Sequence, residues 1–242
     1  MKETMFTVAL VGPDGAGKTT IAQRLEHTFP LPVKYLYMGV NLASSNYMLP
    51  TTRLIHMIKR TSGTKPERAG PPHPAQPAPR PKGMVKRGAA SLKSSLSLVN
   101  QLAEEWFRQG LAWCYQSRGY IVLFDRHFFS DYYAYDIAVG REGRSLHRRI
   151  HGFLLDRVYP KPDLVIYLDA PAEVLFARKG EGTIESLEHR RQGYLQMRSF
   201  VKHFAVVDAS QPADDVAQEV ARLVWDFYLS QAGLRLAPRG RN

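Results

Sequence analysis

The feature that most constrains this chain is the segment from Gly12 to Thr19, which reads Gly-Pro-Asp-Gly-Ala-Gly-Lys-Thr. An apolar run at residues 6–11 precedes it, and residues 20–25 follow it with apolar side chains at helical spacing. A G-x-x-x-x-G-K-[ST] sequence between a strand and a helix is a phosphate-binding loop, or P-loop. The sequence therefore predicts that this chain binds a nucleoside triphosphate.

Each residue type in the P-loop has a physical task. Glycines let the backbone turn so that its N–H groups converge on phosphate oxygens, and the N-terminus of the following helix adds partial positive charge. Lys18 can reach the β- and γ-phosphates, and the hydroxyl of Thr19 can hold Mg²⁺. The residues expected to bind the nucleotide are Gly12, Asp14, Gly15, Ala16, Gly17, Lys18, Thr19 and Thr20.

The alternation of apolar runs with helical patterns predicts the fold class. Continuous apolar runs bounded by Gly and Pro are typical of strands that are buried on both faces of a parallel sheet. We therefore expect a single α/β domain with a three-layer P-loop NTPase fold, in which helices cover both faces of a mostly parallel sheet. The expected strands are 6–11, 33–38, 120–125, 164–169 and 204–208, and the expected helices are 18–27, 91–118 and 214–229.

The longest expected helix, 91–118, has apolar residues near the 3.6-residue period. The sequence around Cys114 is also apolar, so we expect this cysteine to lie in the core. The stripe consists of Leu92, Leu96, Val99, Leu102, Trp106 and Trp113.

The formal net charge of +11 is concentrated outside the expected core. Residues 59–88 contain eight Lys or Arg residues and one Glu, and three Arg residues follow Gly233. The stretch at about 60–88 is also rich in proline, which predicts a disordered insert. Because the insert has no interleaved aromatic residues to stack on bases, nucleic acid is not an expected partner.

Composition also bounds the location of the chain. A single cysteine excludes an internal disulfide, and no apolar run is long enough to span a bilayer. The first residues lack the apolar segment of a signal peptide. We expect a cytoplasmic protein without a membrane span.

A second motif, Asp125-Arg126-His127, stands at the end of an expected strand. In open parallel sheets, ligands bind beyond the C-terminal ends of the strands. A carboxylate there can orient Mg²⁺-bound water or accept a proton, and the adjacent guanidinium can clamp a phosphate. The motif therefore predicts that Asp125 and Arg126 take part in phosphoryl transfer.

Four segments together resemble the thymidylate kinase family of nucleoside monophosphate kinases. Residues 14–20 match its D-G-x-G-K-[ST]-T form, and residues 125–127 match its D-R-[YH] motif. Residues 168–174 resemble the strand and helix before the family's lid, and residues 208–212 resemble a segment that passes near the adenine of ATP. The resemblance implies transfer of the γ-phosphoryl group of Mg·ATP to a small acceptor, most simply dTMP, which would give dTDP.

Carried over by position, the resemblance also implies residue roles. Asp14 would bind the acceptor's sugar hydroxyl or help to order Mg²⁺, and Asp125 would lie between the two substrates. Because this chain has Gly15 where some members have a P-loop Arg, the catalytic cation is expected from a lid at about 178–193, where Arg178, Lys179, Arg190 and Arg191 are candidates. The expected catalytic residues are Lys18, Asp125, Arg126 and Arg178, and the expected Mg²⁺ ligands are Thr19 and Asp125.

The acceptor side departs from the family pattern. Residues 38–41 replace its Arg-Glu-Pro-Gly-Gly-like stretch, and Glu104 or Glu105 stands near its acceptor-binding Arg, with Arg108 one turn later. Two alternatives therefore stay open: a kinase of a sugar or metabolite, and a non-catalytic ATP-binding regulatory module. The expected partners are ATP and a small-molecule acceptor, with a homodimer as a further candidate assembly.

Overall fold

The computed structural model describes residues 5–39, 45, 47–53, 57, 84–132, 146–180 and 182–233. The chain divides into two compact units, which we describe separately. The first, called the P-loop unit, contains Met1–Leu36, Trp113–Arg126 and Pro162–Asn242. The second, called the α3 unit, contains Tyr37–Ala112 and His127–Lys161.

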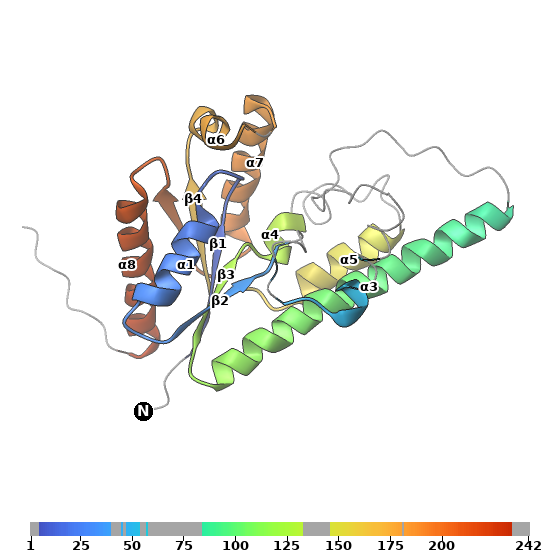
Figure 1. Cartoon of the computed structure of the whole chain (residues 1–242), viewed down its shortest axis with the longest axis horizontal. Coiled ribbons are helices and arrows are strands. Elements are labelled where there is room, and N and C mark those ends of the chain that lie inside the picture. Colours follow the sequence, from blue (N-terminus) through green and yellow to red (C-terminus); the bar gives the residue numbers. More distant parts are fainter. Residues whose placement is uncertain are drawn as a thin grey trace, which may run out of the picture. The chain divides into compact units, whose positions relative to one another are not determined.

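A five-stranded sheet with the order β2-β3-β1-β4-β5 organises the P-loop unit (Figure 1). Its strands are β1 (Thr7–Val11), β2 (Val33–Tyr37), β3 (Ile121–Asp125), β4 (Leu164–Asp169) and β5 (Phe204–Asp208). β1 pairs in parallel with both β3 and β4, and β4 pairs in parallel with β5. Every residue of β1 and β3 is buried, as expected for central strands covered on both faces.

Helices cover this sheet on both faces. α1 (Lys18–Thr28) and α8 (Ala213–Gln231) contact each other on one side of the strands, and α7 (Ile184–Gln196) lies on the other side (Figure 1). On that second side, Tyr194 of α7 stacks on Tyr167 of β4 with ring centroids 5.5 Å apart. The predicted α/β P-loop NTPase fold is confirmed.

Local signals explain where the helices around the nucleotide site begin and end. α1 starts directly after Gly17, whose φ of 83° is left-handed, and α6 (Ala172–Lys179) ends at Gly180, whose φ is 64°. α7 begins after Thr183, whose side chain accepts from the backbone N–H of Ser186 in a capping box. The segment predicted as a lid, at about 178–193, therefore includes the end of α6 and most of α7.

The α3 unit contains α4 (Phe128–Tyr132), α5 (Leu146–Arg157) and most of α3 (Met84–Ser117), whose last residues from Trp113 belong to the P-loop unit. α3 begins before the predicted start at residue 91, so the last residues of the Pro-rich stretch are helical. The rest of the insert predicted at about 60–88 lies outside the described residues.

The side chains of α3 are distributed differently from the predicted stripe. Leu96, Val99 and Trp106 are 62%, 63% and 37% exposed, whereas Glu104 and Arg108 are buried. The buried face is polar because charged groups there pair with one another and with backbone carbonyls. Cys114 is exposed, so the prediction that it lies in the core was wrong.

Candidate functional site

The backbone of the P-loop requires glycine at two close approaches. Gly12 has a φ of 147°, and a Cβ atom on it would lie 2.6 Å from the carbonyl oxygen of Leu168. Gly15 has a φ of 91°, and its Cβ would lie 3.0 Å from the carbonyl oxygen of Leu175. A Cβ at Gly12 would therefore clash with the backbone, and a Cβ at Gly15 would be tightly placed on a backbone conformation that favours glycine. The P-loop is seated directly on the end of β4 and on α6.

Lys18 has its ammonium group beside the P-loop. The side chain is buried, and Nζ donates a hydrogen bond to the carbonyl oxygen of Pro13 at 2.7 Å. Ala16 is also buried, while Gly17, Thr19 and Thr20 are exposed at the start of α1. The lysine thus crosses over the P-loop, which is the position from which it can reach a bound polyphosphate.

Asp125 ends β3 next to the P-loop helix. Its Oδ2 atom accepts a hydrogen bond from Thr19 Oγ1 at 2.5 Å and another from Tyr35 Oη at 3.1 Å. Its Oδ1 atom is buried and has no hydrogen-bond partner. A buried carboxylate oxygen without a donor carries a desolvation cost, so a ligand that binds here gains a ready-made interaction.

Asp14 is the centre of a cluster of cations. It forms a hydrogen-bonded ion pair with Arg126, and it lies 3.8 Å from Lys179 Nζ and 3.5 Å from Arg190 Nη1. Burial alone would raise the pKa of Asp14, but the positive charges of Arg126 and Lys18 hold its pKa far below the ordinary value. The carboxylate therefore stays ionised and gathers positive charge at the P-loop.

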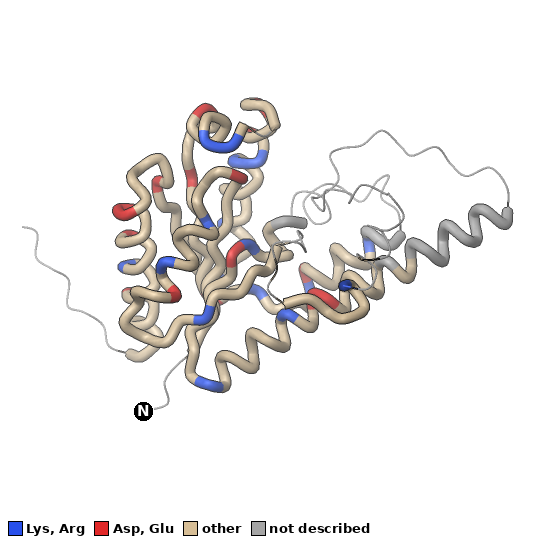
Figure 2. The backbone as a smooth tube through the Cα atoms, in the orientation of Figure 1, with Lys and Arg blue, Asp and Glu red and all other residues tan. Residues whose placement is uncertain are grey.

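The two other lid candidates have different partners. The guanidinium of Arg178 donates to the carbonyl oxygens of Ala209 at 2.7 Å and Ser210 at 3.3 Å, so it links α6 to the turn after β5. Arg191 forms a bidentate ion pair with Asp169, in which Nε donates to Oδ1 at 2.8 Å and Nη2 donates to Oδ2 at 2.9 Å. Figure 2 shows how basic positions gather on α6 and α7. Of the four candidates, Lys179 and Arg190 are the ones within ion-pair distance of the P-loop carboxylate.

Arg126 has an unusual backbone conformation. Its φ is 67°, and it is the only non-glycine residue with a positive φ among those that the structure describes. The left-handed region costs a residue with a Cβ about 1 kcal/mol, and such strain is often found at functional sites. The chain accepts this cost at the residue whose guanidinium binds Asp14.

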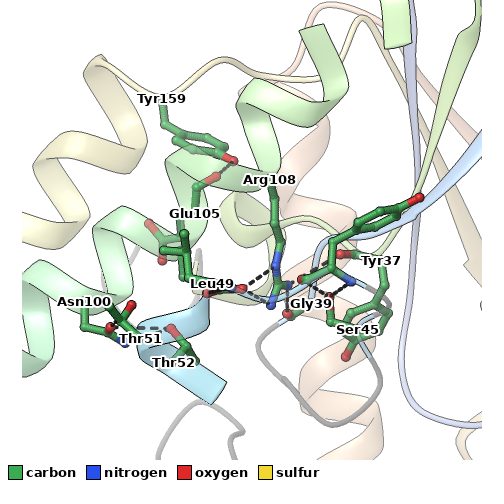
Figure 3. Close-up of polar contacts among 12 residues, drawn as sticks. Tyr37, Gly39, Ser45, Leu49, Thr51, Thr52, Asn100, Glu105, Arg108 and Tyr159 are labelled. Atoms are coloured by element: carbon green, nitrogen blue, oxygen red, sulfur yellow. Dashed lines mark hydrogen bonds and ion pairs between the residues drawn. The ribbon is translucent and has the colours of Figure 1, made fainter. Parts of the chain in front are cut away.

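A buried polar network occupies the α3 unit (Figure 3). Arg108 donates to Glu104 Oε1 at 2.9 and 3.1 Å and to the carbonyl oxygen of Gly39 at 2.9 Å, and its side chain is fully buried. Glu104 Oε2 accepts from the backbone N–H of Leu49 at 3.1 Å. The pair therefore fixes the backbone on both sides of the segment from Gly39 to Leu49, at the place where the sequence departs from the family's acceptor-binding stretch.

The neighbouring Glu105 belongs to the same network. Its Oε1 atom lies 2.9 Å from Nε2 of His151, and its backbone carbonyl accepts from Tyr159 Oη at 3.1 Å. His127, the third residue of the Asp-Arg-His motif, packs its ring against Tyr159. Burial lowers the pKa of His127 to about 3, so this imidazole is neutral at physiological pH.

Tyr35 is the residue that the sequence analysis missed at the nucleotide site. It lies on β2, far along the chain from Asp125, and only the neighbouring positions of β2 and β3 in the sheet bring the two together. A tyrosine in a buried strand is the available signal, because its hydroxyl needs a hydrogen-bond partner there.

The chain is similar to known proteins over most of its length. A family model described as thymidylate kinase matches residues 98–220, a span that contains Asp125, Arg126 and the lid. None of the described helices is long and apolar enough to cross a membrane.

Several curated proteins are also similar over long segments. A probable thymidylate kinase of Archaeoglobus fulgidus is 27% identical over 227 residues, which cover 91% of this chain and 95% of that protein. Probable thymidylate kinase 1 of Saccharolobus solfataricus is 31% identical over 43% of this chain and 54% of its own length. A thymidylate kinase of Thermosipho africanus is 27% identical over 51% of this chain and 62% of its own length.

These matches confirm the resemblance predicted from four short segments. The family model covers just over half of the chain, and the alignment with the Archaeoglobus protein covers 91% of it. This chain belongs to the thymidylate kinase family.

Proposed function

We propose that this chain transfers the γ-phosphoryl group of Mg·ATP to dTMP. Family membership makes it an ATP-dependent phosphotransferase, and the relatives' names point to thymidylate as the acceptor. The observation that carries the proposal is the convergence of Lys18, Asp125, Arg126 and the lid cations on one P-loop. Phosphoryl transfer needs little covalent chemistry from the protein, so positioned charge is sufficient to accelerate it.

On the donor side, the P-loop binds the triphosphate. Backbone N–H groups of residues 14–19 and the N-terminus of α1 supply donors, and Lys18 supplies a cation for the β- and γ-phosphates. Arg126 holds phosphate from the end of β3. Each of these groups lies within the P-loop unit.

The residues at the end of β3 fit a Mg²⁺ ion. Mg²⁺ prefers oxygen ligands and is usually held by one or two carboxylates together with substrate phosphates and water. Thr19 supplies a hydroxyl, and Asp125 supplies a carboxylate with one oxygen that is buried and without a donor. When bound there, Mg²⁺ would neutralise charge on the phosphates of ATP.

We assign the lid cations to Lys179 and Arg190. Both lie within ion-pair distance of Asp14 in the P-loop, whereas Arg178, the residue put forward from the sequence, is engaged with backbone carbonyls. Cations beside the transferring phosphoryl group stabilise the charge that develops on its oxygens. Asp14 keeps these cations at the P-loop before the nucleotide arrives.

The test is ADP release from Mg·ATP by the purified protein, with dTMP, other nucleoside monophosphates and sugars added singly. Stimulation by dTMP supports the proposal, and the Lys18→Ala variant should lose turnover by about 10³-fold or more while it keeps its fold. Stimulation by a sugar alone would refute dTMP as the acceptor. Near-normal transfer by a folded Lys18→Ala protein would refute the assignment of the site. Cytoplasmic location and homodimer assembly stay predictions.

A further inference from the structure

Asp125 is held by two donors on the same oxygen. Thr19 Oγ1 and Tyr35 Oη both donate to Oδ2, at 2.5 and 3.1 Å, and Oδ1 is left buried without a hydrogen-bond partner. A carboxylate can rotate about its Cβ–Cγ bond and exchange its two oxygens unless its surroundings distinguish them. The hydroxyls of Thr19 on α1 and Tyr35 on β2 both donate to Oδ2, and they thereby distinguish it from Oδ1.

The two donors have different duties in the proposed reaction. The hydroxyl of Thr19 is a metal ligand in that proposal, so its oxygen must also face the ion. Tyr35 is not a metal ligand in that proposal, and the residue is buried in β2 at 7% exposure. A hydroxyl that is buried on a rigid strand and donates to a charged group forms a stronger hydrogen bond than one between neutral groups.

We propose that Tyr35 is a positioning residue that fixes the orientation of Asp125, so that Oδ1 is the oxygen offered to the metal and its water shell. This inference rests on the proposed Mg·ATP site and adds a residue to it that no P-loop motif contains. Tyr35 acts through Asp125 and does not itself touch the nucleotide. Groups that orient metal ligands typically change metal affinity or activity by about 10- to 100-fold when they are removed.

The experiment measures ATP binding without any acceptor, by calorimetry, once with excess Mg²⁺ and once with EDTA. The ratio of the two affinities is the metal-dependent gain. In Tyr35→Phe, which keeps the ring and removes the hydroxyl, we expect this gain to fall about ten-fold, while the affinity in EDTA stays at the wild-type value. Thermal unfolding of the variant checks that its fold is retained.

A matched control is available on β4. Tyr167 is buried, and its hydroxyl donates to Oδ1 of Asp169 at 2.7 Å. Tyr167→Phe thus removes the same kind of hydrogen bond from a different aspartate, and we expect it to leave the metal-dependent gain unchanged. A wild-type gain in Tyr35→Phe would overturn the proposal, and so would an equal loss of affinity with Mg²⁺ and with EDTA.

The design separates this inference from the choice of acceptor. If dTMP fails to stimulate ADP release but Tyr35→Phe still loses its metal-dependent gain, the acceptor proposal fails and the role of Tyr35 stands. If dTMP is phosphorylated and the gain is unchanged, the role of Tyr35 is refuted while the proposed function stands.

Discussion

Replacing Arg108 by Met should strongly destabilise the α3 unit. The side chain is fully buried and donates to Glu104 and to the carbonyl oxygens of Gly39 and Tyr37, at 2.9 and 3.4 Å. Its guanidinium also lies 5.4 Å from the ring centre of Phe128. Methionine fills part of the volume, but it leaves a buried carboxylate and two carbonyl groups without these donors.

The expected loss of unfolding free energy follows from the contacts that Arg108→Met removes. Removing one partner of a buried ion pair typically costs about 3–5 kcal/mol, because the other charge remains buried without compensation. A single domain has about 5–15 kcal/mol of total stability, so this loss should be visible as a large shift of the urea midpoint. The double variant Glu104→Gln/Arg108→Met removes the stranded charge and should recover about 1–2 kcal/mol of the loss.

A control with the same chemistry on the surface is Arg222→Met. Arg222 pairs with Glu219 at 2.6 Å and Asp226 at 2.8 Å on α8, but its side chain is 56% exposed. Because water screens exposed pairs, we expect this change to cost less than about 1 kcal/mol. The test compares the unfolding free energies of the three variants with that of the wild type in urea. If Arg108→Met costs no more than Arg222→Met, the argument from burial is refuted.

Three further outcomes are expected. Lys179→Met and Arg190→Met should each lower kcat by about 10²–10³-fold in steady-state kinetics. The control Arg198→Met, at an exposed residue just after α7, should not. Because the pKa of Asp14 is lowered in the folded state, its contribution to stability is present above about pH 4 and is lost as the pH falls further. The difference in unfolding free energy between wild type and Asp14→Asn should therefore shrink from pH 6 to pH 3, and a constant difference would contradict this. Gly12→Ala should abolish ATP binding in calorimetry, because the P-loop cannot hold a Cβ there.

The sheet and the P-loop could be predicted closely from the sequence. β4 and β5 begin and end at the predicted residues. For β4 the reason is that a strand buried on both faces is a continuous apolar run with clear limits, and the edge strand β5 is likewise an apolar run that ends at Asp208. The P-loop could be predicted equally well from the sequence, since its glycines are favoured by local backbone geometry. The roles of its residues stay predictions.

Features that depend on contacts between residues far apart in the sequence could not be predicted as well. The buried face of α3 is polar because Glu104 and Arg108 meet backbone groups from residues 37–49, and periodicity alone favoured the opposite face. Neighbouring residues of the predicted lid also make contacts that the sequence pattern does not predict. Arg178 and Lys179 are adjacent in sequence, yet successive helical residues point about 100° apart, so one meets backbone carbonyls and the other faces Asp14.

The left-handed backbone of Arg126 has a consequence for how this position can change. Glycine would adopt a φ of 67° without strain, so Arg126→Gly satisfies the main chain and removes the guanidinium that binds Asp14. Arg126→Lys has the opposite effects, because it keeps a positive charge at this position and also keeps the backbone strain. The main chain thus favours glycine at this position, whereas the ion pair with Asp14 and the proposed phosphate contact favour arginine. Arg126→Gly relieves about 1 kcal/mol of backbone strain and removes a charge that stabilises ionised Asp14, so its unfolding free energy measures the balance between the main chain and the ion pair.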